Sequence, residues 1–448
     1  MSAKRARRRK KRLPEAPVEV EISAMSSEGR GIAYVDERTV FIDQALPGER
    51  VFFKYTRLTK NIAEGCAVEI LQASDLRVEP KCQAFTMCGG CSLQHMSSAA
   101  QIELKQSMLL DQLKHNDVMP GEILPPLPGP EYGYRHKARL GVRYVHKKEK
   151  VLVGFRERNA SFITETSRCE VLHPSVGEII EPLAECIARL QAKRSIAQIE
   201  VAVGDNHTAL VFRHLEELCQ EDRTILRDFC TAHSLVCYLQ AGKPDDLELL
   251  TADRTEPLHY YLATLQGDLK IEFQPSDFIQ VNPQINKRMV LNAIQYLDLK
   301  KTDAVLDLFS GLGNFSLAMA GNCSQVTAVE GSLVMVKKAR DNAAINNIEN
   351  VEFVFADLYG DDVQSDPWLI KQYQKILLDP PRSGAAEILP ALKKMQASII
   401  VYVSCHPATL ARDAAVLVND LGYSLKQAGI MDMFPHTGHV ESIAVFEK

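Results

Sequence analysis

Apolar and polar residues alternate one by one through residues 14–73, which is the pattern of β-strands with one buried face. The alternating segments are short, follow one another closely and are punctuated by Gly29, Gly31 and a Pro-Gly pair at 47–48. In order they read VEVEIS, GRGIAYV, RTVFID, RVFFKYTRL and CAVEIL. Short strands at this spacing predict a small β-barrel over residues 14–73.

The rest of the chain divides into a mixed region and a regular one. Residues 97–115 have a helical period, and PGEILPPLPGP at 119–130 has the composition of a linker. Strands and helices then mix to about residue 265, so we expect a mixed α+β central domain over 74–265, whose helix 97–115 can pack on the C-terminal domain. From 266 to 448 strands alternate with helices, which predicts an α/β, Rossmann-like domain with a parallel, doubly wound sheet. Its expected strands are AVLDLF, VTAVE, VEFVFA, KILLDPP and IIVYVS.

Length, composition and charge predict how many domains the chain has and where the protein is located. A chain of 448 residues with 46% hydrophobic positions is long enough for several domains with real cores. Residues 1–13 are expected to be a disordered basic tail, either solubilising or in contact with a polyanion such as a nucleic acid. Its cations are Lys4, Arg5, Arg7, Arg8, Arg9, Lys10, Lys11 and Arg12. No signal peptide or membrane-spanning run is apparent, so we expect a cytoplasmic protein without a membrane partner.

The strand VLDLF is followed by a glycine-bearing turn and a helix. Gly311 and Gly313 let the backbone approach a ligand, and Glu330 at the end of the next strand can bind both hydroxyls of a ribose. Ser316 stands where the dinucleotide pattern has its third glycine, which favours S-adenosylmethionine over NAD as the cofactor. Asp357, at the end of VEFVFAD, can meet the adenine or simply cap a helix.

Two residues near the C-terminus have the chemistry of a nucleophile and a base. Cys405 follows the apolar strand IIVYVS, and Glu441 lies in HVESIAVF. A thiolate that adds to carbon 6 of a pyrimidine makes an enolate, whose carbon 5 can take a methyl group from a sulfonium. Glu441 can then remove the carbon-5 proton. Alone, each residue is more simply a core thiol or a surface charge; beside the cofactor turn they predict a methyl transfer.

Four cysteines stand apart from the other seven. Cys82, Cys88 and Cys91 have the spacing C-x5-C-x2-C, and Cys169 follows in SRCEVLHP. Four thiolates can hold an iron–sulfur cluster or a structural zinc ion, and spacing leaves both open. The radical-enzyme spacing C-x3-C-x2-C is absent from this cluster, so a radical initiator is not expected. We expect the remaining cysteines other than Cys405 to be core thiols.

Three motifs, LLDPPRSG, VSCHPATLARD and HVES, resemble the signatures of the RNA uracil-C5 methyltransferases. The resemblance covers residues 14–448 and is closest to the type that methylates a uridine of 23S ribosomal RNA. It implies Cys405 as nucleophile and Glu441 as base. It places Gln280, Phe309, Asn314, Glu330 and Asp357 around S-adenosylmethionine, with Asp379 beside them at the uracil. His406 departs from the family, which usually has Asn after the cysteine; it could lower the thiol pKa or only end the strand.

The resemblance also implies a [4Fe–4S] cluster on Cys82, Cys88, Cys91 and Cys169. It implies that the barrel is a TRAM domain, an OB-like RNA-binding module, and it suggests a monomer. The segment YGYRHKARLGVRY at 132–144 interleaves rings with cations and could stack bases and meet phosphates, or be a charged strand face. Phe278 is expected to stack on the flipped target base.

Other functions remain open at this point. A transfer-RNA uracil methyltransferase resembles the C-terminal half but lacks the barrel and the cysteine cluster. A DNA cytosine-C5 enzyme usually carries its nucleophile after a proline on an earlier strand, whereas Ser404 precedes Cys405 here. A non-catalytic RNA-binding assembly factor on a decayed fold is the last alternative, and the intact Cys405, Glu441 and Asp379 argue against it.

Overall fold

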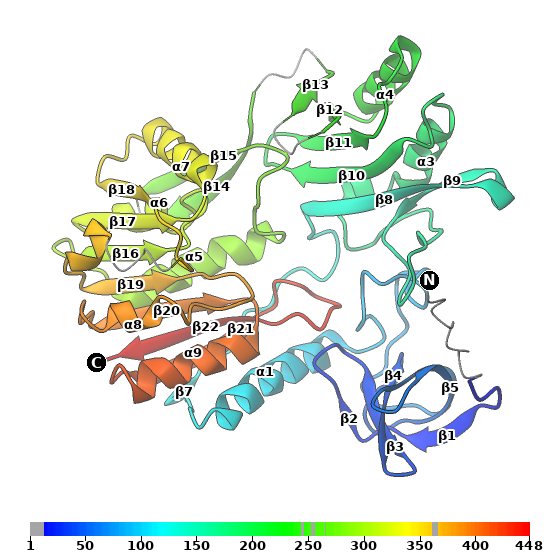
Figure 1. The fold of residues 1–448 in the computed structure, drawn as a ribbon, viewed down its shortest axis with the longest axis horizontal. Helices are drawn as coiled ribbons and strands as arrows, with labels where there is room; N and C mark the ends of the chain where they lie inside the picture. The colour runs from blue at the N-terminus through cyan, green and yellow to red at the C-terminus, as the bar shows by residue number, and fades with distance from the viewer. Residues whose placement is uncertain (1–12, 243–245, 252–255, 265, 361–365) are drawn as a thin grey trace, which may run out of the picture. The chain divides into compact units, whose positions relative to one another are not determined.

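A computed structural model describes residues 13–448 of the protein, apart from 243–245, 252–255, 265 and 361–365 (Figure 1). The basic cluster predicted to contact nucleic acid, 1–12, therefore lies outside the described residues. The chain forms two compact units. The first holds the N-terminal strands with residues 91–101 and 436–438, and the second holds residues 82–90, 102–435 and 439–448.

The first unit is built on the five alternating segments, all of which are strands. They form a six-stranded sheet together with one two-residue strand, in the order β1-β5-β6-β4-β3-β2. The strands are β1 (Val18–Glu21), β2 (Ala24–Met25), β3 (Gly31–Val35), β4 (Arg38–Asp43), β5 (Arg50–Leu58) and β6 (Ala63–Gln72). Their inward positions, among them Val40, Ile42, Val51 and Phe53, make one apolar core. The period-two pattern therefore predicted this unit correctly.

The second unit contains a mixed sheet in its central part. Its order is β13-β12-β11-β10-β8-β9. The strands are β8 (Lys137–Val145), β9 (Lys150–Gly154), β10 (Ile196–Val203), β11 (Thr208–His214), β12 (Leu235–Gln240) and β13 (Leu247–Leu249). Three helices accompany this sheet: α2 (Pro174–Gly177), α3 (Ile180–Ala188) and α4 (Gln220–Ala232). Cys186, Cys230 and Cys237 are buried in its core, as expected of structural thiols.

An eight-stranded sheet dominates the C-terminal part of the same unit, in the order β18-β17-β16-β19-β20-β22-β21-β7. Its predicted strands are β16 (Ala304–Leu308), β17 (Gln325–Glu330), β18 (Val351–Phe355), β19 (Lys375–Leu378) and β20 (Ile399–Ser404), and they are parallel. Helices flank it, as Figure 1 shows: α5 (Pro283–Leu297), α6 (Ser316–Ala320), α7 (Leu333–Ile345), α8 (Leu389–Leu392) and α9 (Pro407–Asn419). A hairpin of β14 (Leu258–Thr264) and β15 (Gly267–Phe273) precedes α5.

Two features of this sheet differ from the expectation. The sheet is not purely parallel, because β22 (Glu441–Glu447) runs antiparallel between β20 and β21 (Ser424–Met431). The segment 119–130 is not only a linker: β7 (Glu122–Ile123) pairs with β21 at the sheet edge, and the amides of Leu124 and Leu127 bond to β21 carbonyls. Its proline content hid these pairings, because a proline-rich strand can still pair along one edge.

The helix predicted over 97–115 is α1 (Ser98–His115), and it packs where the sequence suggested. Leu109 and Leu113 are fully buried in the same core as the sheet residues Leu306, Ile400 and Phe446. None of the helices in the described part of the chain is both long and apolar enough to cross a membrane.

Candidate active site

A cavity of about 650 Å³ lies in the second unit at the carboxyl ends of β16, β17, β19 and β20, where ligands bind in open α/β sheets. All eight residues singled out from the sequence as catalytic or cofactor-binding line it. They are Gln280, Phe309, Asn314, Glu330, Asp357, Asp379, Cys405 and Glu441. They come from segments up to about 160 residues apart, which only the strand order brings together.

The glycine turn after β16 has positive φ angles, and its backbone is hydrogen-bonded to Glu330. Gly311 and Gly313 have φ of 56° and 89°, and Phe309 has φ of 67°, a conformation that is costly for a residue with a side chain. The carboxylate of Glu330 accepts bonds from the amides of Gly311 and Ser332, both at 3.0 Å. These bonds fix the carboxylate at the cavity wall, where its remaining lone pairs can accept from the hydroxyls of a ribose.

Asn314 is fixed by two side chains that the sequence did not reveal. Its Oδ1 accepts from the hydroxyl of Tyr260 at 2.9 Å and from Nδ2 of Asn286 at 3.0 Å, and its Nδ2 donates to Oδ1 of Asn286 at 2.9 Å. Tyr260 lies on β14 and Asn286 on α5, in segments that share no motif with the turn. A residue whose role is to orient another leaves little trace in a single sequence.

Asp357 makes a local turn contact and caps no helix among the described residues, and its expected contact with the adenine stays a prediction. Its Oδ1 accepts from the amide of Tyr359 at 3.0 Å, which is a local turn contact, and the same side chain lines the cavity. Tyr359 in turn lies against Phe309, with ring centroids 5.8 Å apart, and donates to the carbonyl of Gly384 at 2.8 Å. The turn therefore orients both an acid and an aromatic wall of the cavity.

The ladder between β20 and β22 brings the predicted nucleophile near the predicted base. Ser404, the last residue of β20, pairs with Ser442, so Cys405 directly follows the ladder at the end where Glu441 begins β22. Cys405 is half-buried and Glu441 is buried. The two side chains are close enough for Glu441 to affect the pKa of Cys405.

The site raises the pKa values of all three groups at its centre. Desolvation raises the pKa of Cys405 to about 11, with Glu441 and Asp379 adding to it and Arg382 opposing it. Desolvation also raises the pKa of Glu441 well above its usual range, again with Asp379 adding and Arg382 opposing. The pKa of Asp379 is raised to about 7 by desolvation. Clusters of such shifts are typical of catalytic sites.

His406, which departs from the family pattern, caps helix α9. Its Nδ1 accepts from the amide of Thr409 at 3.4 Å, and Pro407 follows at the first helical position. This is the contact that a capping side chain makes, so His406 ends the strand and starts the helix.

The RNA-contact surface expected at 132–144 is only partly available. Tyr134 is 3% exposed and donates to the carbonyl of Pro435 at 3.0 Å, so its ring cannot stack on a base in this structure. Arg139 is exposed but pairs with Glu200 at 3.3 Å. Phe278, in contrast, is 74% exposed and lines the cavity, so it can receive an extruded base.

Three of the four predicted metal-binding cysteines lie near one another. Cys82 and Cys88 each add to the raised pKa of Cys169, which burial brings to about 11, and Cys88 adds to that of Cys82. Cys91 belongs to the first unit. Within the described residues no group of three or more His, Cys, Asp or Glu side chains has an arrangement that could hold a metal ion. The predicted cluster is therefore not apparent from the side-chain positions.

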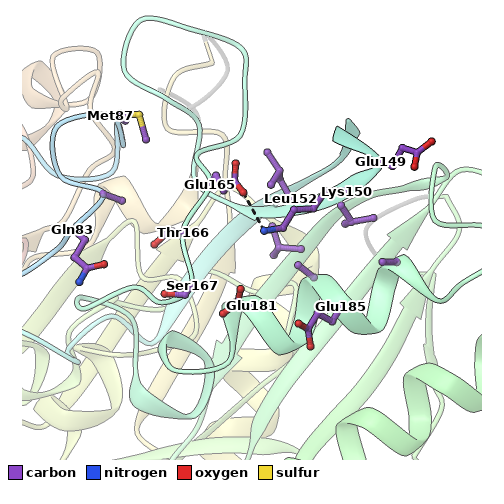
Figure 2. A pocket seen from close by; sticks show the side chains of 15 residues that line it. Gln83, Met87, Glu149, Lys150, Leu152, Glu165, Thr166, Ser167, Glu181 and Glu185 are labelled. Carbon is purple, nitrogen blue, oxygen red and sulfur yellow. Dashed lines mark hydrogen bonds and ion pairs between the residues drawn. The ribbon is translucent and has the colours of Figure 1, made fainter. Parts of the chain in front are cut away.

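A second cavity, of about 480 Å³, lies beside α3 and β9 in the central part (Figure 2). Its charged lining is mostly acidic, with Glu149, Glu165, Glu181 and Glu185 around Lys150, which donates to Glu165 at 3.0 Å. Such a lining repels phosphate, which argues against this cavity as a site for a phosphate-bearing ligand.

Comparison with known proteins gives the chain a family. A model described as tRNA (Uracil-5-)-methyltransferase matches residues 99–448, and a TRAM domain model matches residues 16–68. The 23S rRNA (uracil(1939)-C(5))-methyltransferase RlmD of Alcanivorax borkumensis is 49% identical over 98% of this chain and 99% of its own. The enzyme of the same name from Nitrosococcus oceani is 48% identical over 98% of each chain.

A solved structure agrees on the fold. The Pyrococcus abyssi tRNA (uracil-54, C5)-methyltransferase, in complex with S-adenosyl-L-homocysteine, superposes with a TM-score of 0.73 over 96% of this chain and all of that one, at 23% identity. The barrel is thus a TRAM domain, and the C-terminal part has the methyltransferase fold. The chain belongs to the family of RNA uracil-C5 methyltransferases.

Proposed function

We propose that the protein transfers a methyl group from S-adenosylmethionine to carbon 5 of a uridine in 23S ribosomal RNA. The observation that carries the proposal is that Cys405, which directly follows β20, and Glu441, the first residue of β22, line the same cavity as Glu330. Full-length identity near 49% to enzymes named for 23S rRNA supports this substrate over transfer RNA.

The residues support the following sequence of steps. The Cys405 thiolate adds to carbon 6 of the uracil and forms a carbon–sulfur bond, and the pair of electrons moves into an enolate. Carbon 5 then takes the methyl group that the sulfonium of the bound cofactor supplies. Glu441 removes the proton from carbon 5, and the electrons left behind expel the thiolate from carbon 6. The methylated ring and the free thiol result.

In the cavity, burial opposes the charged forms of Cys405 and Glu441 that these steps need. Glu441 must be ionised to act as a base, but its burial favours the neutral acid, and so does the nearby Asp379. Both Cys405 and Glu441 need the cation of Arg382 to lower the cost of their charged forms. A uracil between them would also exclude water and bring new hydrogen-bond partners to the acids.

We further propose that Cys82, Cys88, Cys91 and Cys169 hold a [4Fe–4S] cluster. Cys88 adds to the raised pKa of Cys82, and both add to the raised pKa of Cys169, so bound iron would supply the positive charge that lets these thiols ionise together. Cys91 follows Cys88 by three positions in the sequence and completes the set. The cluster would have a structural role, tying the cysteine segment to residues near 169.

The function can be tested with purified protein, labelled S-adenosylmethionine and two unmodified RNAs. The protein should label 23S rRNA, and mass mapping of RNase fragments should place the label in a single 5-methyluridine. Transfer RNA offered at equal concentration should remain unlabelled. Labelling of transfer RNA alone would support the transfer-RNA alternative, and binding of RNA without any methylation would support the assembly-factor alternative.

A further inference from the structure

Arg382 and His439, two exposed residues that line the cavity, form a contact that the reaction scheme does not use. Nη2 of Arg382 lies 3.2 Å from Nδ1 of His439, and both side chains line the same cavity as Cys405 and Glu441. A guanidinium can only donate, so Nδ1 of His439 must accept. The ring is therefore neutral, with its proton on Nε2.

The charges around His439 favour the same neutral state. Desolvation, with the cations of Arg382, Arg135 and Lys105 and with His406 acting in the same direction, lowers the pKa of His439 to about 4. On the acidic side, Asp379 and Glu441 line the cavity that His439 shares. The imidazole is thus an acceptor for Arg382 throughout the physiological pH range.

The ring of His439 is held from its other side. Phe434 packs against it edge to face, with centroids 5.5 Å apart. The carbonyl of Phe434 accepts from Nζ of Lys105 at 2.9 Å, and Lys105 also pairs with Asp432 at 2.6 Å. The imidazole therefore packs against a loop that is itself tied to helix α1.

Arg382 in turn interacts electrostatically with Cys405 and Glu441. Its cation lowers the pKa of both Cys405 and Glu441, against the raising effect of burial and of Asp379. Arginine side chains are long and mobile, so such an effect depends on a partner that keeps the guanidinium in place. In the described part of the site, Nδ1 of His439 makes a direct contact with it.

We propose that His439 is a positioning residue, whose neutral ring holds the Arg382 guanidinium in the cavity so that the Cys405 thiolate and the Glu441 carboxylate can form there. The proposal rests on the proposed function in that it takes these two groups as nucleophile and base. His439 acts through Arg382 and takes no direct part in the bond changes.

The test measures the Cys405 thiol directly in the full-length protein, without RNA. Iodoacetamide alkylation of the Cys405 peptide is followed by mass spectrometry between pH 7.5 and 9.5, where the rate rises tenfold per pH unit below the thiol pKa. In His439→Phe, which keeps a ring against Phe434 but loses the acceptor, we expect rates about tenfold lower at each pH, as for a pKa raised by about one unit. His439→Asn offers Oδ1 near the position of Nδ1 and should recover most of the rate.

The Arg382→Met variant supplies the internal reference. It removes the cation, so it should shift the Cys405 profile at least as far as His439→Phe, and the double variant should go no further than Arg382→Met alone. Additive shifts, an unshifted profile in His439→Phe, or an equal loss in His439→Asn would each overturn the positioning role. Because alkylation needs no RNA, it decides this question even if methylation of 23S rRNA fails.

Discussion

Nζ of Lys105 lies 2.6 Å from Oδ1 of Asp432, and the two side chains are 0% and 3% exposed. Lys105 comes from the middle of α1, whereas Asp432 directly follows β21, more than 300 residues later. The same ammonium donates to the carbonyl of Phe434, which lines the cavity. A helix outside the methyltransferase sheet is thereby tied to one wall of the active site.

We expect Lys105→Met to destabilise the protein strongly. The substitution leaves Asp432 buried without its cation, a change that typically lowers the free energy of unfolding by about 3–5 kcal/mol. Urea unfolding followed by circular dichroism measures it. The double variant Lys105→Met, Asp432→Asn should recover part of the loss, and a Lys105→Met protein as stable as wild type would contradict the role of the pair.

Helix α1 shows what a single sequence can and cannot predict. Its helical period gave Ser98–His115 to within a residue, because Leu109 and Leu113 repeat at helical spacing. Lys105 lies four positions before Leu109, on the same face of the helix, but the sequence gives no partner for its buried charge, because that partner is a carboxylate 327 residues away. Likewise the alternation in 14–73 predicted the barrel, but no local signal shows that β22 runs antiparallel.

Cys405→Ala should abolish methylation while leaving cofactor affinity within about twofold of wild type. The thiol forms the bond to carbon 6, whereas Glu330 and Asn314 line the cofactor side of the cavity. Single-turnover labelling and calorimetric titration with S-adenosylhomocysteine measure the two properties. Cys219→Ala, another half-buried thiol outside the cavity, is the matched control and should retain full activity. Turnover by the Cys405 variant would exclude the covalent mechanism.

Glu441→Gln should accumulate a covalent protein–RNA adduct. The amide has nearly the same shape as the carboxylate but cannot take the carbon-5 proton, so the methylated intermediate cannot expel the thiol. A band of reduced mobility on a denaturing gel, carrying both RNA and methyl label, reports it. The double variant Cys405→Ala, Glu441→Gln must lack this band, and its absence from the single variant at saturating cofactor would remove Glu441 from the role of base.

Asp379→Asn should stabilise the ligand-free protein at pH 8 while weakening methylation. Desolvation raises the pKa of Asp379 from 3.8 to about 7, so the folded state prefers the protonated acid. The protonated Asp379 therefore contributes fully to folding stability below pH 4, and this contribution is lost as the pH rises to 7. Asp379→Asn should therefore raise the free energy of unfolding by roughly 1–3 kcal/mol at pH 8, a range set low because the side chain is partly exposed. The difference from wild type should vanish near pH 4.

Melting temperatures of wild type and the Asp379→Asn variant across this pH range test whether the variant is the more stable of the two. Asp298→Asn is the control, because Lys300 lowers the pKa of that exposed acid and no stabilisation is expected there. A variant that is less stable than wild type at pH 8 would show that the Asp379 carboxylate is held by favourable contacts in its ionised form.

The residues that line the cavity could be predicted from the sequence, whereas the side chains that hold them in place could not. Residues that end parallel strands, such as Glu330 and Cys405, share the cavity because all such ends meet at one sheet edge. Tyr260, Asn286 and His439 contact other side chains of the site. Although His439 begins the HVES motif, no local pattern encodes these contacts, since they depend on packing between segments distant in the chain.

The assignment of four cysteines to an iron–sulfur cluster predicts the iron and sulfide content of the purified protein. Protein purified without oxygen should be brown and contain about four iron and four sulfide per chain. Serine at Cys82, Cys88, Cys91 or Cys169 should lower the iron content and then solubility or RNA binding, because the loss frees a long loop. Affinity for S-adenosylhomocysteine should change less, since the cofactor side chains lie at the methyltransferase sheet.

Cys66→Ser is the matched control for these variants, because Cys66 is a half-buried thiol on β6 that is not assigned to the cluster. It should keep the iron content and the colour of wild type. The buried thiols of the central sheet, such as Cys230, are unsuitable for this purpose, since their substitution would disturb the apolar core itself. A colourless wild-type protein that binds one zinc ion and methylates RNA fully would replace the iron–sulfur assignment with a structural zinc site, and it would leave the roles of Cys405 and Glu441 unchanged.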